Sequence, residues 1–181
     1  MANKILGIAG SLRNDSYNKA VLKTLAQSSW EGVEIEVFDI SSIPLYNGDL
    51  DGEHPPDPVR KFKDAIAASA GVLIVSPEYN YGIPGVLKNA LDWASRPGYK
   101  SVLKGKQVAV ITCSMATTGG ARAQSSIRDC LYACLAQVVP SPEVAIPSVQ
   151  DKVQGGLLTD ARSLELAGGL VKALAQASRT A

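Results

Sequence analysis

Residues 10–18, GSLRNDSYN, concentrate side chains that can donate hydrogen bonds. The loop lacks the Gly-Lys-Ser/Thr ending of a P-loop, and after Gly10 the later glycines of the dinucleotide fingerprint are missing. Hydroxyl, amide and guanidinium donors at a helix N-terminus instead suit a terminal phosphate, which has three oxygens to satisfy. Alternatively, the serines and asparagines only cap the helix that follows. The donors are Ser11, Arg13, Asn14, Ser16 and Asn18.

A second polar loop, SPEYNYGIPG (76–85), follows a run of apolar residues that is typical of a buried strand. Pro77 should end that strand, while Gly82 and Gly85 allow unusual dihedral angles or the close approach of another surface. The residues between them could offer backbone N–H groups and two tyrosine faces to a planar heterocycle. This stretch therefore predicts a site for a flat ring.

Two features of this loop have other interpretations. Glu78 could act as a general acid or base, but the sequence pairs it with no second carboxylate or base, so it could equally be a solvated loop acid. Tyr79 and Tyr81 could belong to the interface of an oligomer.

A third loop, CSMATTGGARAQ (113–124), places two glycines before a helical pattern and leaves residues 114–118 free to wall a pocket. Taken together, the three loops predict a phosphate held by the first and a flat ring held between the second and the third.

The elements that must position these loops alternate between strand and helix patterns. Apolar runs predict five strands, the last of which contains Pro140 and Pro142 and should lie at an edge. Helical spacing follows each strand, and Asp57-Pro58 should cap the second helix. The predicted strands are 4–10, 33–40, 71–76, 107–114 and 138–147, and the helices begin near residues 16, 57, 84, 119 and 159.

Five β-α repeats predict an α/β fold with a parallel sheet, helices on both faces and right-handed crossovers. Ligands of such folds bind outside the carboxyl ends of the strands, where all three loops should lie. The length of 181 residues, with no repeat or long linker, predicts a single domain over 1–181.

Composition excludes several classes of partner. Lys and Arg number 18 and Asp and Glu 17, so a net charge of +1 gives no electrostatic reason to expect nucleic acid or an anionic membrane. No apolar run reaches the ~20 residues of a membrane helix, and the first residues lack a signal-peptide core. We expect a cytoplasmic protein.

The cysteines and the one histidine do not predict a metal centre. Cys130 and Cys134 share a helix face, which could be half of a metal site, but they are expected to pack as small apolar groups. Cys113, at a strand end, could be a reactive thiol, but nothing nearby should lower its pKa. His54 lies in a turn-rich loop and should be solvated. We expect neither a metal nor a histidine in the chemistry.

The sequences of these motifs and their order along the chain resemble those of the NADPH-dependent FMN reductase family, the flavodoxin-like quinone, chromate and azo-compound reductases. The resemblance rests on GSLRxxSxN, YNGDL (46–50), SPEYNYGIPGVLKNALDW and SMxxxGGARAQ, and it covers nearly the whole chain. It implies a three-layer flavodoxin-like sandwich with a five-stranded parallel sheet in the order 2-1-3-4-5, and FMN bound non-covalently.

The resemblance also implies the roles of particular residues. Around the phosphate it places Ser11, Arg13, Ser16, Tyr17 and Asn18. Along the isoalloxazine it places Pro77, Glu78, Tyr79 and Asn80, whose backbone amides would face the pyrimidine edge and N5, with Ser114 on the other side. Relatives often carry glycine at the position of Ala116, so this loop departs from the family pattern.

The resemblance implies an enzyme in which NAD(P)H reduces FMN and the flavin then reduces quinones, azo dyes, chromate or free flavin. It further implies a homodimer or homotetramer, with Asp49 and Tyr81 as candidate contacts. Two alternatives remain at this stage: a flavodoxin-type electron carrier, and a nucleoside-processing enzyme with Glu78 as nucleophile. The sequence selects neither NADPH nor NADH.

Overall fold

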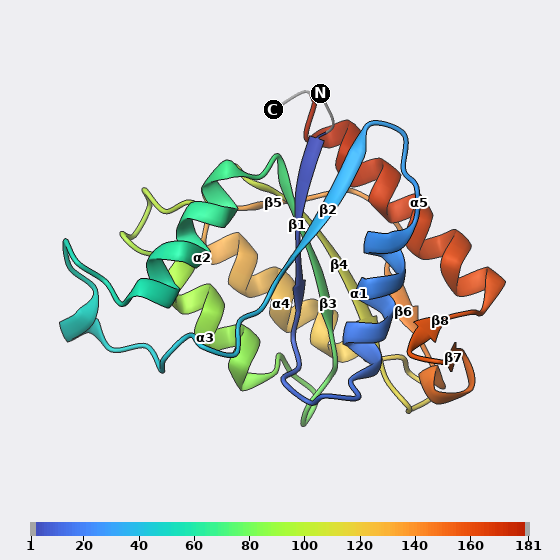
Figure 1. Cartoon of the computed structure of the whole chain (residues 1–181). Helices are drawn as coiled ribbons and strands as arrows, with labels where there is room; N and C mark the ends of the chain where they lie inside the picture. Colours follow the sequence, from blue (N-terminus) through green and yellow to red (C-terminus); the bar gives the residue numbers. More distant parts are fainter. Residues whose placement is uncertain (1–2, 180–181) are drawn as a thin grey trace.

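The computed structural model describes residues 3–179 and has a parallel sheet at its centre (Figure 1). The strand order is β2-β1-β3-β4-β5, as predicted, and a sixth strand also pairs with β4. The strands are β1 (Asn3–Ala9), β2 (Val33–Phe38), β3 (Gly71–Ser76), β4 (Gln107–Cys113), β5 (Gln137–Val138) and β6 (Val144–Ile146).

The edge beyond β4 differs from the prediction of one strand over 138–147. It consists of two short pieces, β5 and β6, and both run parallel to β4. Pro140 and Pro142 lie between them, and proline has no N–H to donate to the ladder. The predicted strand is therefore interrupted where the prolines stand.

Helices cover both faces of the sheet, which confirms the three-layer sandwich (Figure 1). On one face lie α1 (Tyr17–Gln27) and α5 (Ala161–Ala177), and on the other lie α2 (Asp57–Ala68), α3 (Gly85–Ala94) and α4 (Ala121–Ala133). Two 3₁₀ turns, η1 (Gly48–Leu50) and η2 (Val149–Asp151), lie in the loops.

A small hairpin of β7 (Val153–Gln154) and β8 (Leu157–Leu158) precedes α5 and was not predicted. Its turn is Gly155-Gly156, and both residues have positive φ. A Gly-Gly pair between short apolar stretches is a hairpin signal, so the sequence did contain this element.

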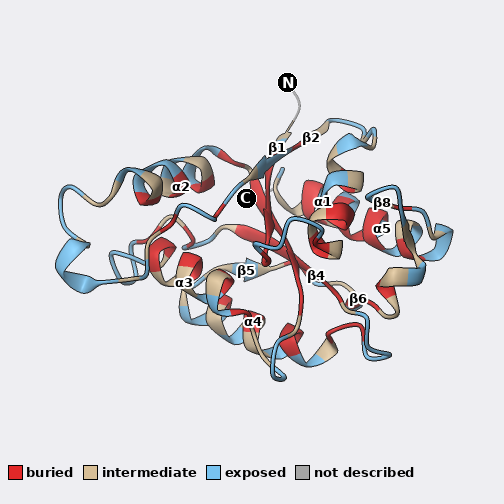
Figure 2. Ribbon diagram, turned by 60° about the horizontal axis from the view of Figure 1, so that its bottom comes forward, coloured by how far each residue is buried: buried red, intermediate tan, exposed pale blue. Residues whose placement is uncertain are grey.

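Buried residues, red in Figure 2, run along the central strands and on the helices. Their side chains form two cores because successive residues of a strand point to opposite faces. Leu73 and Ile111 pack on the α1 and α5 side, whereas Ile74 and Val110 pack under α2, α3 and α4. Every residue of β3 and β4 is buried, as expected for central parallel strands.

The start of α2 corrects one prediction. Asp57 does not cap the helix: it is the first helical residue, and the preceding Pro56 makes no side-chain cap. The Asp57 carboxylate instead accepts a hydrogen bond from Arg60 Nη2 at 2.8 Å. A proline at position 58 suits the first turn, where its missing N–H is not needed.

Phe62 tests the core between α2 and the sheet, because it is fully buried. Phe62→Ala should lower the free energy of unfolding by about 3–5 kcal/mol through lost burial and the cavity left behind. Urea denaturation followed by circular dichroism measures this loss. Tyr132→Ala, at a side chain that is 82% exposed, serves as the control and should change stability by no more than about 0.5 kcal/mol. Equal losses in the two variants would contradict this core.

Candidate functional site

The three polar loops meet at the carboxyl edge of the sheet. β1 and β3 end side by side, with Ala9 opposite Val75, and β3 and β4 end together, with Ser76 opposite Thr112. Between the loops lies a cavity of about 230 Å³, which also touches Cys113, Met115 and Val149. All the predicted site residues except Asn80 line it, namely Ser11, Arg13, Ser16, Tyr17, Asn18, Pro77, Glu78, Tyr79 and Ser114.

The first loop presents donors that have few partners in the protein. Ser16 is the N-cap of α1 and accepts from Lys19 N at 3.4 Å, so the capping alternative is correct for this residue. Its hydroxyl hydrogen remains free to donate. Within residues 3–179, the Ser11 hydroxyl has no hydrogen bond and Arg13 has no ion pair; the Arg13 guanidinium lies 5.4 Å from the Tyr17 ring centroid. This donor set fits a phosphate.

A buried hydrogen bond joins the first loop to the end of β4. The Cys113 thiol donates to Asn18 Oδ1 at 2.9 Å, which leaves the Asn18 amide nitrogen as its donor toward a ligand. Burial raises the pKa of Cys113 to about 12. The thiol therefore stays protonated at neutral pH and is no nucleophile, as expected from the sequence.

The second loop forms a tight turn. Tyr79 N donates to Gly82 O at 3.1 Å, and Gly82 N donates to Tyr79 O at 3.0 Å. Asn80 and Tyr81 have φ of 50° and 66°, the pattern of a type I′ turn. Gly82 and Gly85 do not have positive φ, so of the two alternatives for these glycines, unusual dihedral angles or the close approach of another surface, the first is wrong. Asparagine tolerates this region, whereas a tyrosine there is strained.

The first turn of α4 fixes this strained segment. The Arg122 guanidinium lies 4.1 Å from the Tyr81 ring centroid, a cation–π contact. Glu78 Oε2 accepts from Ala123 N at 3.0 Å, an N–H in the first turn of α4 that also donates to Gly120 O at 3.1 Å. Glu78 is therefore an anchored, half-buried carboxylate rather than a solvated loop acid. Of the two tyrosines in this turn, Tyr79 lines the cavity and Tyr81 does not.

The third loop depends on glycine and on a late segment of the chain. Gly119 and Gly120 have φ of 62° and 83°, and a Cβ on Gly119 would lie 2.8 Å from the backbone nitrogen of Pro147. Val149 N donates to Ser114 O at 3.1 Å, which brings η2 to the cavity. Met115 lines the cavity, as predicted for residues 114–118, whereas the lining roles of Cys113 and Val149 were not predicted. Nothing near Val149 in the sequence marks it, because its position results from tertiary pairing.

The remaining candidate residues lie outside this cavity. Cys130 and Cys134 are half-buried against the core under α4, and burial raises the pKa of both thiols, consistent with packing as apolar groups. His54 is exposed. The described part of the chain contains no group of three or more His, Cys, Asp or Glu arranged to hold a metal. Nor is any helix within residues 3–179 long and apolar enough to cross a membrane.

Comparisons with known proteins agree with this arrangement. The family model "NADPH-dependent FMN reductase" matches residues 3–151. The chain is 44% identical over 159 residues to an NAD(P)H-dependent FMN reductase of Pseudomonas aeruginosa, covering 87% of this chain and 85% of that protein. It is also 44% identical over 154 residues to a 2-hydroxy-1,4-benzoquinone reductase of a Burkholderia species, covering 84% and 83%.

Solved structures give the same result. The flavoenzyme NAD(P)H:(acceptor) oxidoreductase of Paracoccus denitrificans superimposes with a TM-score of 0.88 at 33% identity, covering 99% of this chain and 98% of that one. The resemblance in the loop motifs thus extends to the strand order, the helix layers and most of the sequence. The chain belongs to the NADPH-dependent FMN reductase family.

Proposed function

We propose that this chain is an FMN-dependent NAD(P)H oxidoreductase that passes electrons to quinones and similar acceptors, and that residues 1–181 form its single FMN-binding domain. The observation that supports this most is the cavity itself. In it, hydrogen-bond donors of the first loop that suit a phosphate lie opposite the Tyr79–Gly82 turn. When bound, FMN supplies the redox chemistry by taking a hydride from NAD(P)H and returning electrons to an acceptor. The chain supplies binding, orientation and electrostatics.

The phosphate end of FMN is assigned to the first loop. Ser11 and Ser16 are buried, so their hydroxyl groups act where water competes little and a hydrogen bond is stronger. Arg13 contributes the positive charge. The free N–H groups at the start of α1 form the positive end of the helix dipole, which also attracts a phosphate. Tyr17 and Asn18, the first two residues of that helix, complete the assignment.

The ring end is assigned to residues 77–80 and Ser114. Pro77 has no N–H, and Tyr79 N already donates to Gly82 O. In the described structure the N–H groups of Glu78 and Asn80 have no acceptor, so these two amides are the ones left for the pyrimidine edge and N5. The backbone of Asn80 can contribute in this way although its side chain does not line the cavity.

Quinones are the proposed acceptors because relatives at 37–44% identity are named quinone, benzoquinone or FMN reductases. Azo dyes, chromate and free flavin remain in the proposed range because an exposed flavin face discriminates little between acceptors. The proposal places the enzyme in the cytoplasm, where NAD(P)H is available.

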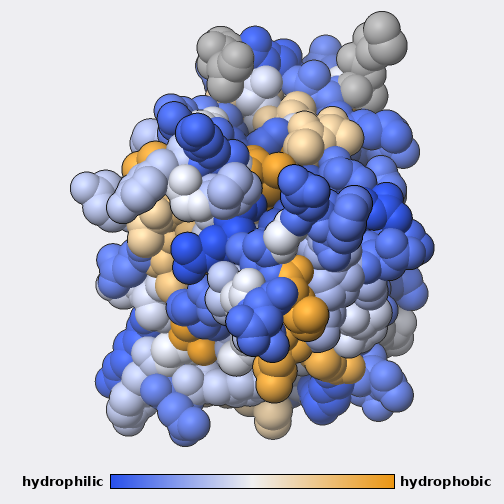
Figure 3. Space-filling model, turned by 90° about the vertical axis from the view of Figure 1, so that its left-hand side faces the viewer, coloured by the Kyte–Doolittle hydropathy of each residue, from blue (hydrophilic) through white to orange (hydrophobic). Residues whose placement is uncertain are grey.

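The proposed assembly is a homodimer or homotetramer. The aromatic side chain of Tyr81 is 70% exposed to solvent. Asp49 lies in η1, between Leu45 and Leu50 in the sequence, and both leucines are also exposed. Hydrophobic atoms gather in patches on the face that carries α2 and α3 (Figure 3). Exposed apolar patches rimmed by polar side chains are typical of interaction sites.

The function can be tested with the purified protein. Reconstitution with FMN should give a yellow protein, and anaerobic NADPH or NADH should bleach its visible absorption until a quinone is added. A protein that does not retain FMN would contradict the proposal. A yellow protein that neither nicotinamide bleaches would indicate an electron carrier instead.

Arg13→Ala tests the phosphate assignment. Losing a charge-assisted hydrogen bond, worth about 1.5–3 kcal/mol, should raise the Kd for FMN by about tenfold to a hundredfold, measured by quenching of flavin fluorescence. Arg13→Lys should lie between, because lysine keeps the charge but not the planar fork. Arg162→Ala on α5 is the matched control. An unchanged Kd in Arg13→Ala would remove Arg13 from the phosphate site.

Glu78 is proposed as a positioning residue, and two variants separate its hydrogen bond from its charge. Glu78→Ala removes the side-chain acceptor of Ala123 N, which keeps only its bond to Gly120 O, and should lower the free energy of unfolding by about 0.5–1.5 kcal/mol. Glu78→Gln keeps an acceptor and loses only the attraction to the helix dipole, about 0.3–1 kcal/mol. Urea unfolding of the FMN-free protein measures both losses. If Glu78→Ala were as stable as the wild type, the anchor would be irrelevant to stability.

A further inference from the structure

A second and larger cavity lies next to the FMN site. It is a groove of about 800 Å³ between α1 and the end of β2, and it shares Ser11, Arg13, Ser16 and Tyr17 with the smaller cavity. The two spaces are therefore adjacent at the first loop. Sites of this volume accommodate small organic ligands and cofactors.

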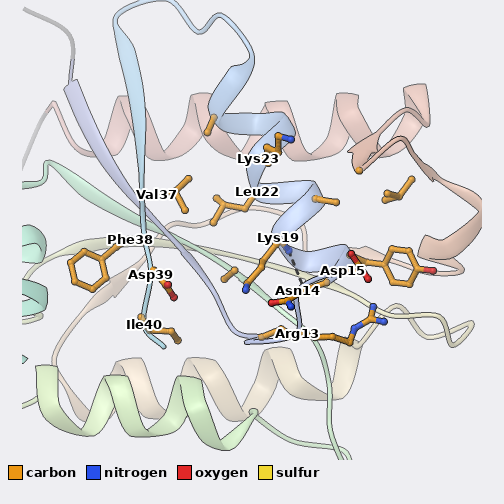
Figure 4. Close-up of a pocket in the computed structure, with 18 of the residues that line it drawn as sticks. Arg13, Asn14, Asp15, Lys19, Leu22, Lys23, Val37, Phe38, Asp39 and Ile40 are labelled. Carbon is orange, nitrogen blue, oxygen red and sulfur yellow. Dashed lines mark hydrogen bonds between the residues drawn. The ribbon is translucent and has the colours of Figure 1, made fainter. Parts of the chain in front are cut away.

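The floor of the groove is apolar. Leu22 and Ala26 of α1 lie opposite Val37 of β2, and Figure 4 shows the Leu22 and Val37 side chains pointing toward each other across it. Val37 is 52% exposed, unusual for a valine in a strand, because α1 does not cover this part of the sheet edge. A flat apolar body the size of a purine would bury this surface.

The rim of the groove carries charges of both signs. Lys19 and Lys23 line it together with two carboxylates, those of Asp15 and Asp39, while Arg13 is assigned to the FMN phosphate. The residues of α1 lie on one helix face because positions 19 and 23 are one turn apart.

The two lysines differ in how far they are already engaged. Lys19 Nζ donates to Leu12 O at 3.2 Å and lies near Asp39 (Figure 4). The Asp39 carboxylate already accepts hydrogen bonds from Ser41 N and Ser41 Oγ. Lys23 has neither an ion pair nor a side-chain hydrogen bond in the described residues. Lys23 is therefore the cation available to an added anion.

We propose that this groove binds the adenosine 2′-phosphate end of NADPH, with the purine against Leu22 and Val37 and the 2′-phosphate at Lys23. The inference rests on the proposed function, since a nicotinamide nucleotide that reaches the flavin must place its other end nearby. NADPH differs from NADH only by that phosphate, so Lys23 becomes the residue that favours NADPH.

The test uses the FMN-loaded protein, so that the phosphate donors of the first loop are occupied. Isothermal titration calorimetry with 2′,5′-ADP, the adenosine half of NADPH, should show binding, and 5′-AMP should bind more weakly. Lys23→Gln should raise the Kd for 2′,5′-ADP by about three- to tenfold, because a charge-assisted contact to phosphate is lost. The ratio of the KM for NADPH to the KM for NADH should rise by a similar factor.

Lys172→Gln, an exposed lysine of α5, is the matched control and should bind 2′,5′-ADP as the wild type does. Val37→Asp should weaken both 2′,5′-ADP and 5′-AMP, with its folding checked by circular dichroism. The proposal is overturned if 2′,5′-ADP does not bind, or if Lys23→Gln binds it unchanged. If either result were found while NADPH still bleached the flavin of the wild type, the proposed function would stand. Only the assignment of the groove to NADPH would then be excluded.

Discussion

Parallel pairing of β1, β3 and β4 is the constraint on which the site depends. Parallel strands end at the same edge of a sheet, so the three loops that follow them must emerge together although they are far apart in the chain. Both faces of these strands are buried, and a one-residue register shift would move each apolar side chain into the opposite core, where it does not fit. The cores that stabilise the fold therefore also hold the donor loop opposite the Tyr-Asn turn.

Within that frame, α4 determines the shape of the turn. A tyrosine in the left-handed region costs on the order of 1–2 kcal/mol. Four contacts oppose this cost: the two bonds between Tyr79 and Gly82, the Arg122 stack on Tyr81, and the Glu78 carboxylate on Ala123 N. The strained turn thus depends on a helix that starts about 40 residues later in the chain, and strain at such positions commonly accompanies a binding site.

The sequence predicted what local patterns determine and missed what tertiary contacts determine. Apolar runs located β1, β3 and β4, and donor-rich loops after them identified nearly all of the cavity lining. The bond between Cys113 and Asn18 joins residues 95 positions apart, and that between Glu78 and Ala123 joins residues 45 apart. No pattern within one segment could indicate them. The sequence also offered no indication that the lysines of α1 belong to a site, because only the fold places them beside β2.

The cavity assigns almost no proton chemistry to side chains, and this fits a reaction carried by a flavin. Cys113 is held protonated, and Glu78 uses its carboxylate to anchor a helix. What remains for the chain is to decide which acceptors approach. Tyr79 and Met115 line the cavity and are both more than half exposed, so apolar surface is accessible at its mouth beside the exposed Arg13. These two side chains offer apolar contact to a planar acceptor, and Arg13 is the one cation lining this cavity among the described residues.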